Sequence, residues 1–171
     1  MANRPPRAEL PLLDRLVDDA PDTPRDTALS SAETMVALRR SVQRDLEALL
    51  NARRRWRSWP ASCGELAVSP LAYGVADFGA GAFSHDEQRE ELRAAIEATI
   101  RRFEPRFVSV RVSLAGTADR LDTTLRLRID ALLRADPAPE PIAFDTLVDT
   151  TSEIVQLRQR AGEDFAGGTD V

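Results

Sequence analysis

The segment from Phe103 to Phe107 constrains the fold more than any other part of the sequence, because the hydrophobic period changes there. Before it, apolar residues recur three or four positions apart from Leu92 onward, which is the spacing of one helix face. After it, residues 107–114 alternate between apolar and polar, which predicts a half-buried strand. Pro105 separates the two patterns, since a proline disfavours the α conformation at the residue before it. The chain must therefore turn from helix to strand within this short segment.

Two helices are predicted from their start signals. Ser30-Ser31-Ala32-Glu33 has the spacing of a capping box, and we expect its helix to extend to about residue 55. Ser84-His85-Asp86-Glu87 is a second such box, and its helix should end before Pro105. The predicted buried faces are Met35, Leu38, Val42, Leu46, Leu49 and Leu50 in the first helix, and Leu92, Ala95, Ile96, Thr99, Ile100 and Phe103 in the second.

Three strands should follow the second helix. Residues 107–114 and the alternating stretch that begins at Leu121 are predicted to form an antiparallel hairpin, and residues 142–149 a third strand. Residues 151–160 favour a short terminal helix. The inward residues of the hairpin are expected to be Val108, Val110, Val112 and Leu114 on one strand, and Leu121, Leu125, Leu127, Ile129 and Ala131 on the other. The fold class is therefore α+β: two helices packed on a small, mainly antiparallel sheet of three or more strands, with a short C-terminal helix. Such a sheet has edges that proteins either block or use for strand addition.

The chain of 171 residues, 43% of them hydrophobic, can bury one sizeable core. We expect a single domain over residues 30–160, preceded by a proline-rich arm (1–29) and followed by a flexible tail (161–171). The long connection from Trp56 to Phe83 contains many apolar residues, so we expect it to be mostly ordered. Those residues are Trp56, Trp59, Leu66, Leu71, Tyr73 and Phe78.

The arm contains one short amphipathic segment, residues 10–17. Its apolar residues surround Asp14 and Arg15, and the segment is too short to be a stable helix by itself. It either folds back onto its own domain or docks in a groove of a partner protein. The apolar residues are Leu10, Leu12, Leu13, Leu16 and Val17.

Composition excludes several classes of function. The net charge of −5 argues against a general nucleic-acid binder, although the basic run 53–57 is a local exception that could instead end a helix or contact an acidic protein. One cysteine, Cys63, with one histidine, His85, forms neither an intrachain disulfide nor a Cys/His metal site, and no cofactor motif is present. Without a signal peptide or an apolar stretch of spanning length, we expect a cytoplasmic protein that meets membranes only through partners.

Two carboxylates form a possible catalytic pair. Glu97 and Glu104 lie seven residues apart on one helix face, about 10 Å along the axis, which is too far for a retaining glycosidase and marginal for an inverting one. A peptidoglycan hydrolase that uses this pair is therefore only an alternative hypothesis. We predict that the chain is not an enzyme.

Glu104 is unusual because it places a negative charge at the negative end of a helix dipole. Arg101, Arg102 and Arg106 are the cations available to compensate it. Pro105 stiffens the backbone between Glu104 and Arg106. Two interpretations remain open: a local ion pair that closes the turn, or a preorganised element in which Arg106 presents its planar fork to a partner.

Several sequence blocks together resemble a known family. The blocks are residues 12–16, 44–54, 73–78 and 91–107 with the strand after them. In this order along the chain they resemble blocks of the baseplate wedge family of contractile injection machines. The bacterial form of that family is the type VI secretion protein TssE, and its phage relatives are called lysozyme-like. The match extends from residue 10 to about residue 160. Two positions depart from it: Ala52 stands where the family usually has threonine, and Ala76 where it has proline.

The resemblance implies a cytoplasmic assembly subunit that contacts the wedge proteins TssF and TssG through Glu104, Pro105 and Arg106. The segment containing Leu12, Leu13 and Leu16 is a second predicted contact. The resemblance also implies a sheet similar to that of the sheath protein, which could start sheath polymerisation by strand exchange. It does not imply a bound catalyst. A regulatory adaptor of the same fold is a further alternative.

Overall fold

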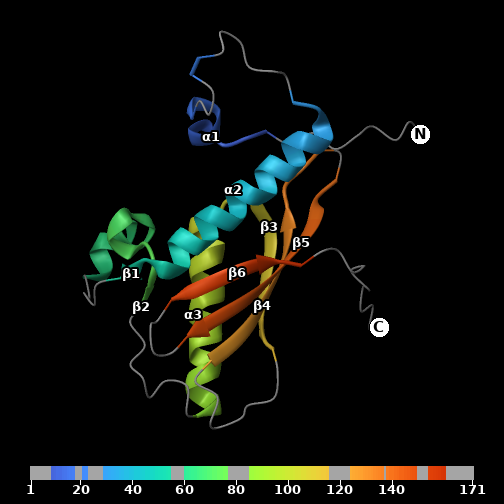
Figure 1. Cartoon of the computed structure of the whole chain (residues 1–171). Helices are drawn as coiled ribbons and strands as arrows, with labels where there is room; N and C mark the ends of the chain where they lie inside the picture. The colour runs from blue at the N-terminus through green and yellow to red at the C-terminus, as the bar shows by residue number, and fades with distance from the viewer. Residues whose placement is uncertain are drawn as a thin grey trace.

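The computed structural model describes residues 9–17, 21–22, 29–54, 60–76, 85–115, 124–136, 138–149 and 154–160. Figure 1 shows two long helices beside one curved sheet. The predicted α+β class is confirmed. The elements in chain order are α1 (Leu12–Leu16), α2 (Ser31–Asn51), β1 (Arg53–Arg54), η1 (Ala61–Val68), η2 (Pro70–Ala72), β2 (Val75–Ala76), α3 (Asp86–Phe103), β3 (Phe107–Leu114), β4 (Thr124–Leu133), β5 (Glu140–Asp149) and β6 (Val155–Gln159), where η denotes a 3₁₀ helix.

Helix α2 begins as the sequence predicts. The Ser30 hydroxyl accepts a hydrogen bond from the Glu33 amide, and the Glu33 carboxylate accepts one from the Ser30 amide, so the capping box is confirmed. All six residues of the predicted face are buried. The helix ends at Asn51, earlier than the predicted residue 55, because Ala52 is already extended and the chain enters β1.

The start of α3 differs from the prediction. The residue at its N-cap is His85, not Ser84, and the His85 side chain makes no capping hydrogen bond; Ser84 lies outside the described residues. The predicted face is otherwise correct, with Leu92, Ile96 and Ile100 buried and the other three residues half-buried. The helix ends at Phe103, directly before the turn that contains Pro105.

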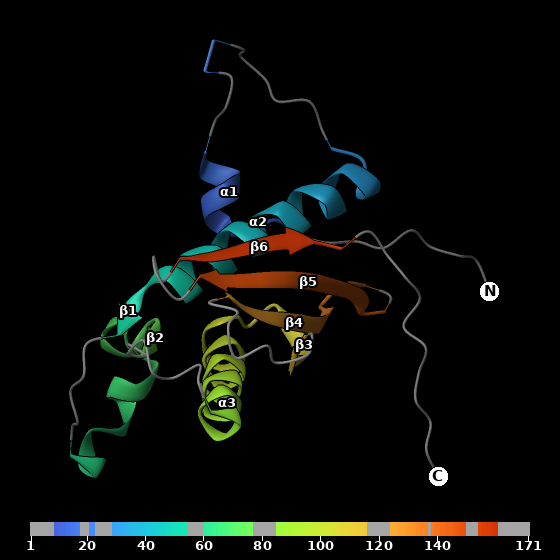
Figure 2. The same cartoon turned by 60° about the horizontal axis from the view of Figure 1, so that its bottom comes forward.

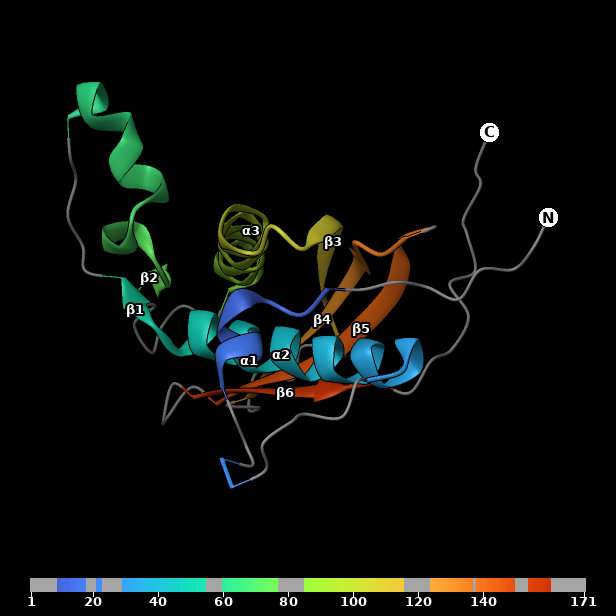
Figure 3. The ribbon, with the colours of Figure 1, turned by 90° about the horizontal axis from the view of Figure 1, so that it is seen from above.

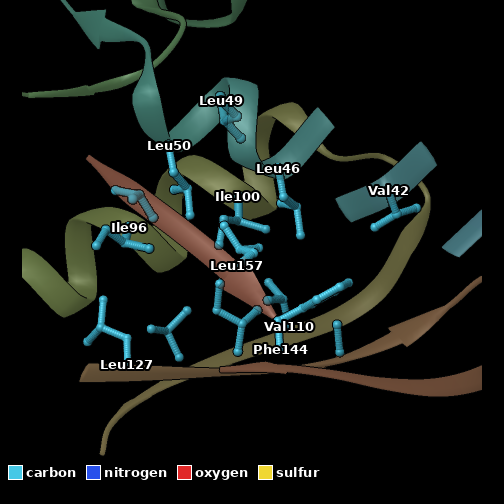
Figure 4. Close-up of a cluster of buried hydrophobic side chains, with 14 of the residues drawn as sticks. Val42, Leu46, Leu49, Leu50, Ile96, Ile100, Val110, Leu127, Phe144 and Leu157 are labelled. Carbon is cyan, nitrogen blue, oxygen red and sulfur yellow. The ribbon is translucent and has the colours of Figure 1, made fainter. Parts of the chain in front are cut away.

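The main sheet has four antiparallel strands in the order β3-β4-β5-β6. Figure 2 shows α2 beside β6, with α3 below the sheet. Residues from both helices and all four strands form one apolar core, part of which is drawn in Figure 4. Phe144 of β5 is completely buried at its centre. No helix within the described residues is long and apolar enough to cross a membrane.

The predicted inward face of β3 is partly wrong. Val110 and Val112 are buried, but Val108 is 52% exposed and Leu114 39% exposed. The register with β4 shifts between Phe107 and Ser109, which indicates a β-bulge. A bulge inserts an extra residue and moves the side chains beside it to the other face, so Phe107 enters the core in place of Val108.

The predicted C-terminal helix is also wrong where the structure describes it. Residues Val155–Gln159 form β6, which pairs with β5 from Val148↔Val155 to Phe144↔Gln159. Val155 and Leu157 are buried while Gln156 and Arg158 are exposed, which is the period of a strand. Gln, Leu and Arg favour helices locally, but pairing with β5 and burial of two apolar side chains outweigh that preference. Leu121, residues 116–119, 151–153 and 161–171 lie outside the described residues.

The connection between α2 and α3 is ordered where it is described. Strands β1 and β2 pair in parallel, and the Val75 amide donates to the Ala52 carbonyl at 3.0 Å. The Tyr73 ring contacts that of Phe103 edge to face. Leu71, however, is 65% exposed, contrary to the expectation that it packs the connection. Trp56, Trp59 and Phe78 lie outside the described residues.

Replacement of Gly74 by alanine should destabilise the protein by at least about 2 kcal/mol. Gly74 has a φ of +100°, and a Cβ there would lie 2.3 Å from the carbonyl oxygen of Ala52. Urea denaturation would measure the change in the free energy of unfolding. The matched control is Gly64→Ala, since nothing lies within 4 Å of a Cβ at Gly64. Equal stability of the two variants would contradict this account of the β1–β2 pair.

Candidate partner-binding site

The corner between α3 and β3 is closed by an ion pair. Glu104 caps the C-terminus of α3 and is only 5% exposed. Its carboxylate accepts hydrogen bonds from the Arg106 backbone amide at 3.1 Å and from Arg106 Nε at 2.6 Å, and a third from Arg106 Nη2. Pro105 itself is exposed at the tip of the turn. The pairing is therefore bidentate and compensates the charge that the helix dipole disfavours.

The same guanidinium also binds α2. Arg106 Nη2 donates to Asp45 Oδ2 at 2.8 Å, and Nη1 donates to the Ser41 hydroxyl at 3.0 Å. All three nitrogens of the guanidinium therefore have partners within the chain. The local ion pair, one of the two interpretations that the sequence left open, is present and extends to a second helix. Neither Arg101 nor Arg102 takes part in it, since Arg101 binds Glu97 and Arg102 donates to the Ala67 carbonyl.

These contacts continue to the N-terminal segment. The Ser41 hydroxyl donates to Asp14 Oδ2, and Arg44 Nη1 donates to Asp14 Oδ1 at 2.6 Å. Arg44 also pairs with Asp45 at 2.9 Å. Figure 3 shows α1 lying over α2. We call Asp14, Ser41, Arg44, Asp45, Glu104 and Arg106 the corner network.

Helix α1 is held by its polar side, and its apolar side chains face away from the domain. Leu12, Leu13 and Leu16 are 69%, 63% and 72% exposed, whereas Leu10 packs partly against the core. The segment therefore does fold back onto its own domain, through Asp14 and Leu10 and not through Leu12, Leu13 or Leu16. Hydrophobic side chains that are fixed in place and exposed together are typical of a protein-binding surface.

The network shifts the pKa values of Arg106 and Asp14. Burial alone lowers the pKa of Arg106, but the hydrogen bonds and charges of Glu104 and Asp45 outweigh it and raise that pKa above its usual value. Burial raises the pKa of Asp14, but hydrogen bonds from Arg44 and Ser41 outweigh that effect and hold the Asp14 pKa below its usual value of 3.8. Each charged form is thus stabilised by its partners.

Sequence analysis identified Glu104, Arg106 and the leucines, but missed Ser41, Arg44 and Asp45. Ser41 lies 65 residues from Arg106, and Asp45 lies 61 residues from it. No local pattern connects residues so far apart. One usable signal was the position of Ser41, a polar residue directly before Val42 on the predicted buried face, where an unpaired hydroxyl is costly.

The proposed catalytic pair is not assembled. Glu97 accepts hydrogen bonds from the Val112 amide at 3.0 Å and from Arg93 and Arg101 at 2.8 Å each. The Val112 amide, followed by the two arginine charges, lowers the pKa of Glu97, whereas a general acid needs a raised one. Glu104 is bound by Arg106 at a separate place. Both carboxylates therefore have structural partners instead of facing a common cleft.

The other candidates from the sequence are Cys63 and the basic run 53–57. Cys63 is exposed with a free thiol, and no group of three or more His, Cys, Asp or Glu residues in the described part could hold a metal ion. Of the basic run, Arg53 and Arg54 form β1, and residues 55–57 lie outside the described residues.

Comparison with models of protein families gives a match. The model of a protein family described as baseplate wedge protein gp25 matches residues 36–138. The matched range includes most of α2, all of α3 and the corner between α3 and β3. No curated protein matches the chain at a significant level.

Replacement of Arg106 by alanine should cost about 3–5 kcal/mol of stability, because it leaves the buried Glu104 carboxylate without its cation. Chemical denaturation monitored by circular dichroism measures this cost. Arg101→Ala is the control, because that arginine is 65% exposed and its ion pair should contribute less than about 1 kcal/mol. A loss no larger than that of the control would show that Glu104 does not depend on Arg106.

Helix α1 should remain docked at neutral pH and be released in acid. Because the Asp14 pKa is lowered in the folded state, its contribution to docking is complete above pH 3.8 and is lost as the pH falls through the lowered value. NMR shifts of the residue 12–17 amides would follow the release. In Asp14→Asn the acid transition should disappear. A release midpoint above pH 3.8, or a transition that persists in Asp14→Asn, would refute the assignment.

Proposed function

Since the chain belongs to the baseplate wedge protein gp25 family and is thus a wedge protein of a contractile injection system, we propose that it is the TssE subunit of a type VI secretion baseplate. The proposal takes the bacterial form of the family, which four separate sequence blocks resemble. In this proposal the subunit works in the cytoplasm, binds the wedge proteins TssF and TssG, helps to start sheath assembly, and catalyses no reaction.

The observation that carries the proposal is the exposed leucine face of α1, held in place by the corner network. Leu12, Leu13 and Leu16 offer an apolar helix face that suits a hydrophobic groove on a wedge partner. The ion pair between Asp14 and Arg44 and the hydrogen bond from the Ser41 hydroxyl fix this face before binding, so little conformational entropy is lost when the partner arrives.

The Glu104-Pro105-Arg106 corner then has two roles in the proposal. Pro105 is exposed and contributes to the contact surface, while Glu104 and Arg106 position it. Arg106 also reaches Ser41, whose hydroxyl holds Asp14 of α1. Changes at the corner should therefore weaken partner binding through loss of α1 position as well as through loss of direct contact.

Replacement of Leu13 and Leu16 together by serine should weaken binding to a purified TssF–TssG complex by at least about tenfold. Each leucine loses apolar burial worth about 1.5–3 kcal/mol at the interface, and 1.4 kcal/mol corresponds to a factor of ten. Biolayer interferometry with the full chain measures the change.

The matched control for this binding experiment is Val36→Ser. Val36 is an apolar residue of α2 that is 47% exposed and belongs to neither α1 nor the corner network. Both variants should unfold at the same temperature as the unmodified chain, because none of the replaced side chains is in the core. Unchanged affinity of the leucine variant would exclude α1 from the wedge contact.

A further inference from the structure

Helix α3 has an exposed face opposite the face that it buries. The buried face is formed by Leu92, Ile96 and Ile100, which pack into the core. Ala94 and Ala98 are exposed. An α-helix turns about 100° per residue, so the two alanines lie nearly half a turn from Ile96. Figure 3 looks along α3, with the sheet to its right and α2 below it. The helix therefore presents small side chains on the side that faces away from the core.

Charged side chains lie on both flanks of these alanines. Glu90 and Arg101 lie along one flank, and their side chains are 59% and 65% exposed. Glu91 and Arg102, which are also exposed, lie along the other flank. The members of each pair are eleven residues apart, which is about three complete turns, so both lie on the same side of the helix. We call this surface the α3 face; it consists of Glu90, Glu91, Ala94, Ala98, Arg101 and Arg102.

The α3 face is symmetric about its midpoint. Ala94 and Ala98 each lie two residues from Ile96. The two acidic residues lie five and six residues before Ile96, and the two basic residues lie five and six residues after it. Reversal of the helix direction therefore places each acid at the height of a base. A surface with this property is complementary to a second copy of itself, as a two-fold pair of identical subunits requires.

The contacts of such a pair follow from helix geometry. When two antiparallel helices are related by a two-fold axis, each flank meets the same flank of the other copy. Glu90 of one copy then meets Arg101 of the second copy, and Glu91 meets Arg102. The alanines lie between these charges, and side chains this small allow the helix axes to approach to about 8 Å, the close end of the usual range. A parallel pair would instead set acid beside acid and base beside base, so the charges select the antiparallel arrangement.

The charges of the α3 face can make these contacts without losing their present neighbours. Arg93 pairs with Glu90 at 2.7 Å, and Arg101 pairs with Glu97 at 2.8 Å. A carboxylate accepts about four hydrogen bonds and a guanidinium donates about five, so each group can keep its partner within the helix and bind a second one. Exposed pairs of this kind also contribute little to stability, so they do not compete strongly with a second copy.

We infer that α3 is a self-recognition surface, on which two copies of this chain pair with their helices antiparallel. Four ion pairs surround the alanines at the two-fold axis. One face of an 18-residue helix extends about 27 Å, which is too small to bury the roughly 1,200 Å² of total surface that stable complexes bury. The pairing is therefore reversible and increases with subunit concentration. Because its charges are exposed, added salt weakens it.

Pairing also places the second copy beside the corner between α3 and β3. Pro105 lies two residues after the end of α3 and is exposed. In the antiparallel pair the first turn of the second copy's α3 lies at this height, so the pair occupies surface that the proposed wedge contact needs. The free subunit is thus shielded until TssF–TssG displaces the second copy. This consequence rests on the proposed function, whereas the pairing itself does not.

Charge reversal followed by mixing tests the pairing. Glu90→Arg with Glu91→Arg makes all four charges of the α3 face basic, and Arg101→Glu with Arg102→Glu makes all four acidic. Each double variant alone should dimerise at least about tenfold more weakly than the unmodified chain in sedimentation velocity, because four attractive pairs become repulsive. An equimolar mixture of the two variants should dimerise as strongly as the unmodified chain, since every pair between copies is then attractive again.

The matched control carries the same charge change on the sheet. Arg126→Glu with Arg158→Glu alters two exposed arginines outside α3 and should weaken dimerisation by less than about twofold, because distant surface charges are screened. Circular dichroism checks the fold of each variant. A mixture that dimerises no better than its two components would overturn the inference.

Disulfide trapping tests the orientation of the helices without altering any charge. In the Cys63→Ser chain, Ala94→Cys and Ala98→Cys are made separately and are then mixed under mild oxidation. Antiparallel pairing brings residue 94 of one copy opposite residue 98 of the other, within the roughly 7 Å between Cα atoms that a disulfide allows. The mixture should therefore form covalent dimers at least about fivefold faster than either variant alone. Equal rates in the mixture and in the single variants would rule out the antiparallel pair.

The pairing and the wedge role fail separately. If the chain stays monomeric at every concentration but binds TssF–TssG, the pairing is wrong and the proposed function stands. If the dimer forms and persists within the wedge complex, the pairing stands and the competition at Pro105 is wrong. If the dimer forms and the chain does not bind TssF–TssG, the pairing stands and the proposed function is wrong.

Discussion

The guanidinium of Arg106 links the end of α3, helix α2 and helix α1, which are far apart in the sequence. Arg106 binds Glu104 at the end of α3, and it reaches Asp45 and Ser41 on α2. Through Ser41 the same contacts reach Asp14 and hence α1. The three carboxylates and two guanidiniums of the corner network compensate each other, and the buried Glu104 carboxylate is tolerated beside the core because Arg106 pairs with it. The position of α1 is thus set by the corner network and not by the helix alone.

A wedge contact on α1, as proposed, would have a physical advantage over a contact made by the corner charges alone. A carboxylate or guanidinium offered to a partner must lose water when the partner binds, and the gain is largely offset. Here the charges have already lost part of their water on folding, and the surface proposed for the partner is apolar. Association can then be driven mainly by the burial of leucine side chains, which requires no further charge pairing.

Features that depend on neighbours in sequence were predictable. The capping box at Ser30, the buried face of α2 and the turn at Pro105 follow from residues within a few positions of each other. Features that depend on distant partners were not. Val155–Gln159 were predicted as part of a helix from their local sequence, whereas pairing with β5 makes them a strand. The bulge beside Val108 arises only in register with β4. The family resemblance supplied the candidate site. The contacts within that site join residues far apart in the sequence and could be found only in the structure.

Side chains of α2 bind the backbone of β6 along its outer edge, and these bonds limit the order in which the chain can fold. Asn51 and Val155 are 104 residues apart, and Gln43 and Leu157 are 114 apart, so α2 cannot complete these bonds until the last strand has been synthesised. The hairpins of β3, β4 and β5 join segments that are close in sequence and can form while α2 is still unattached along that edge. Contacts of such long range form slowly because a large loop must close first. During synthesis, the contacts of α2 with β6 can therefore form only after the C-terminal part of the chain has emerged from the ribosome.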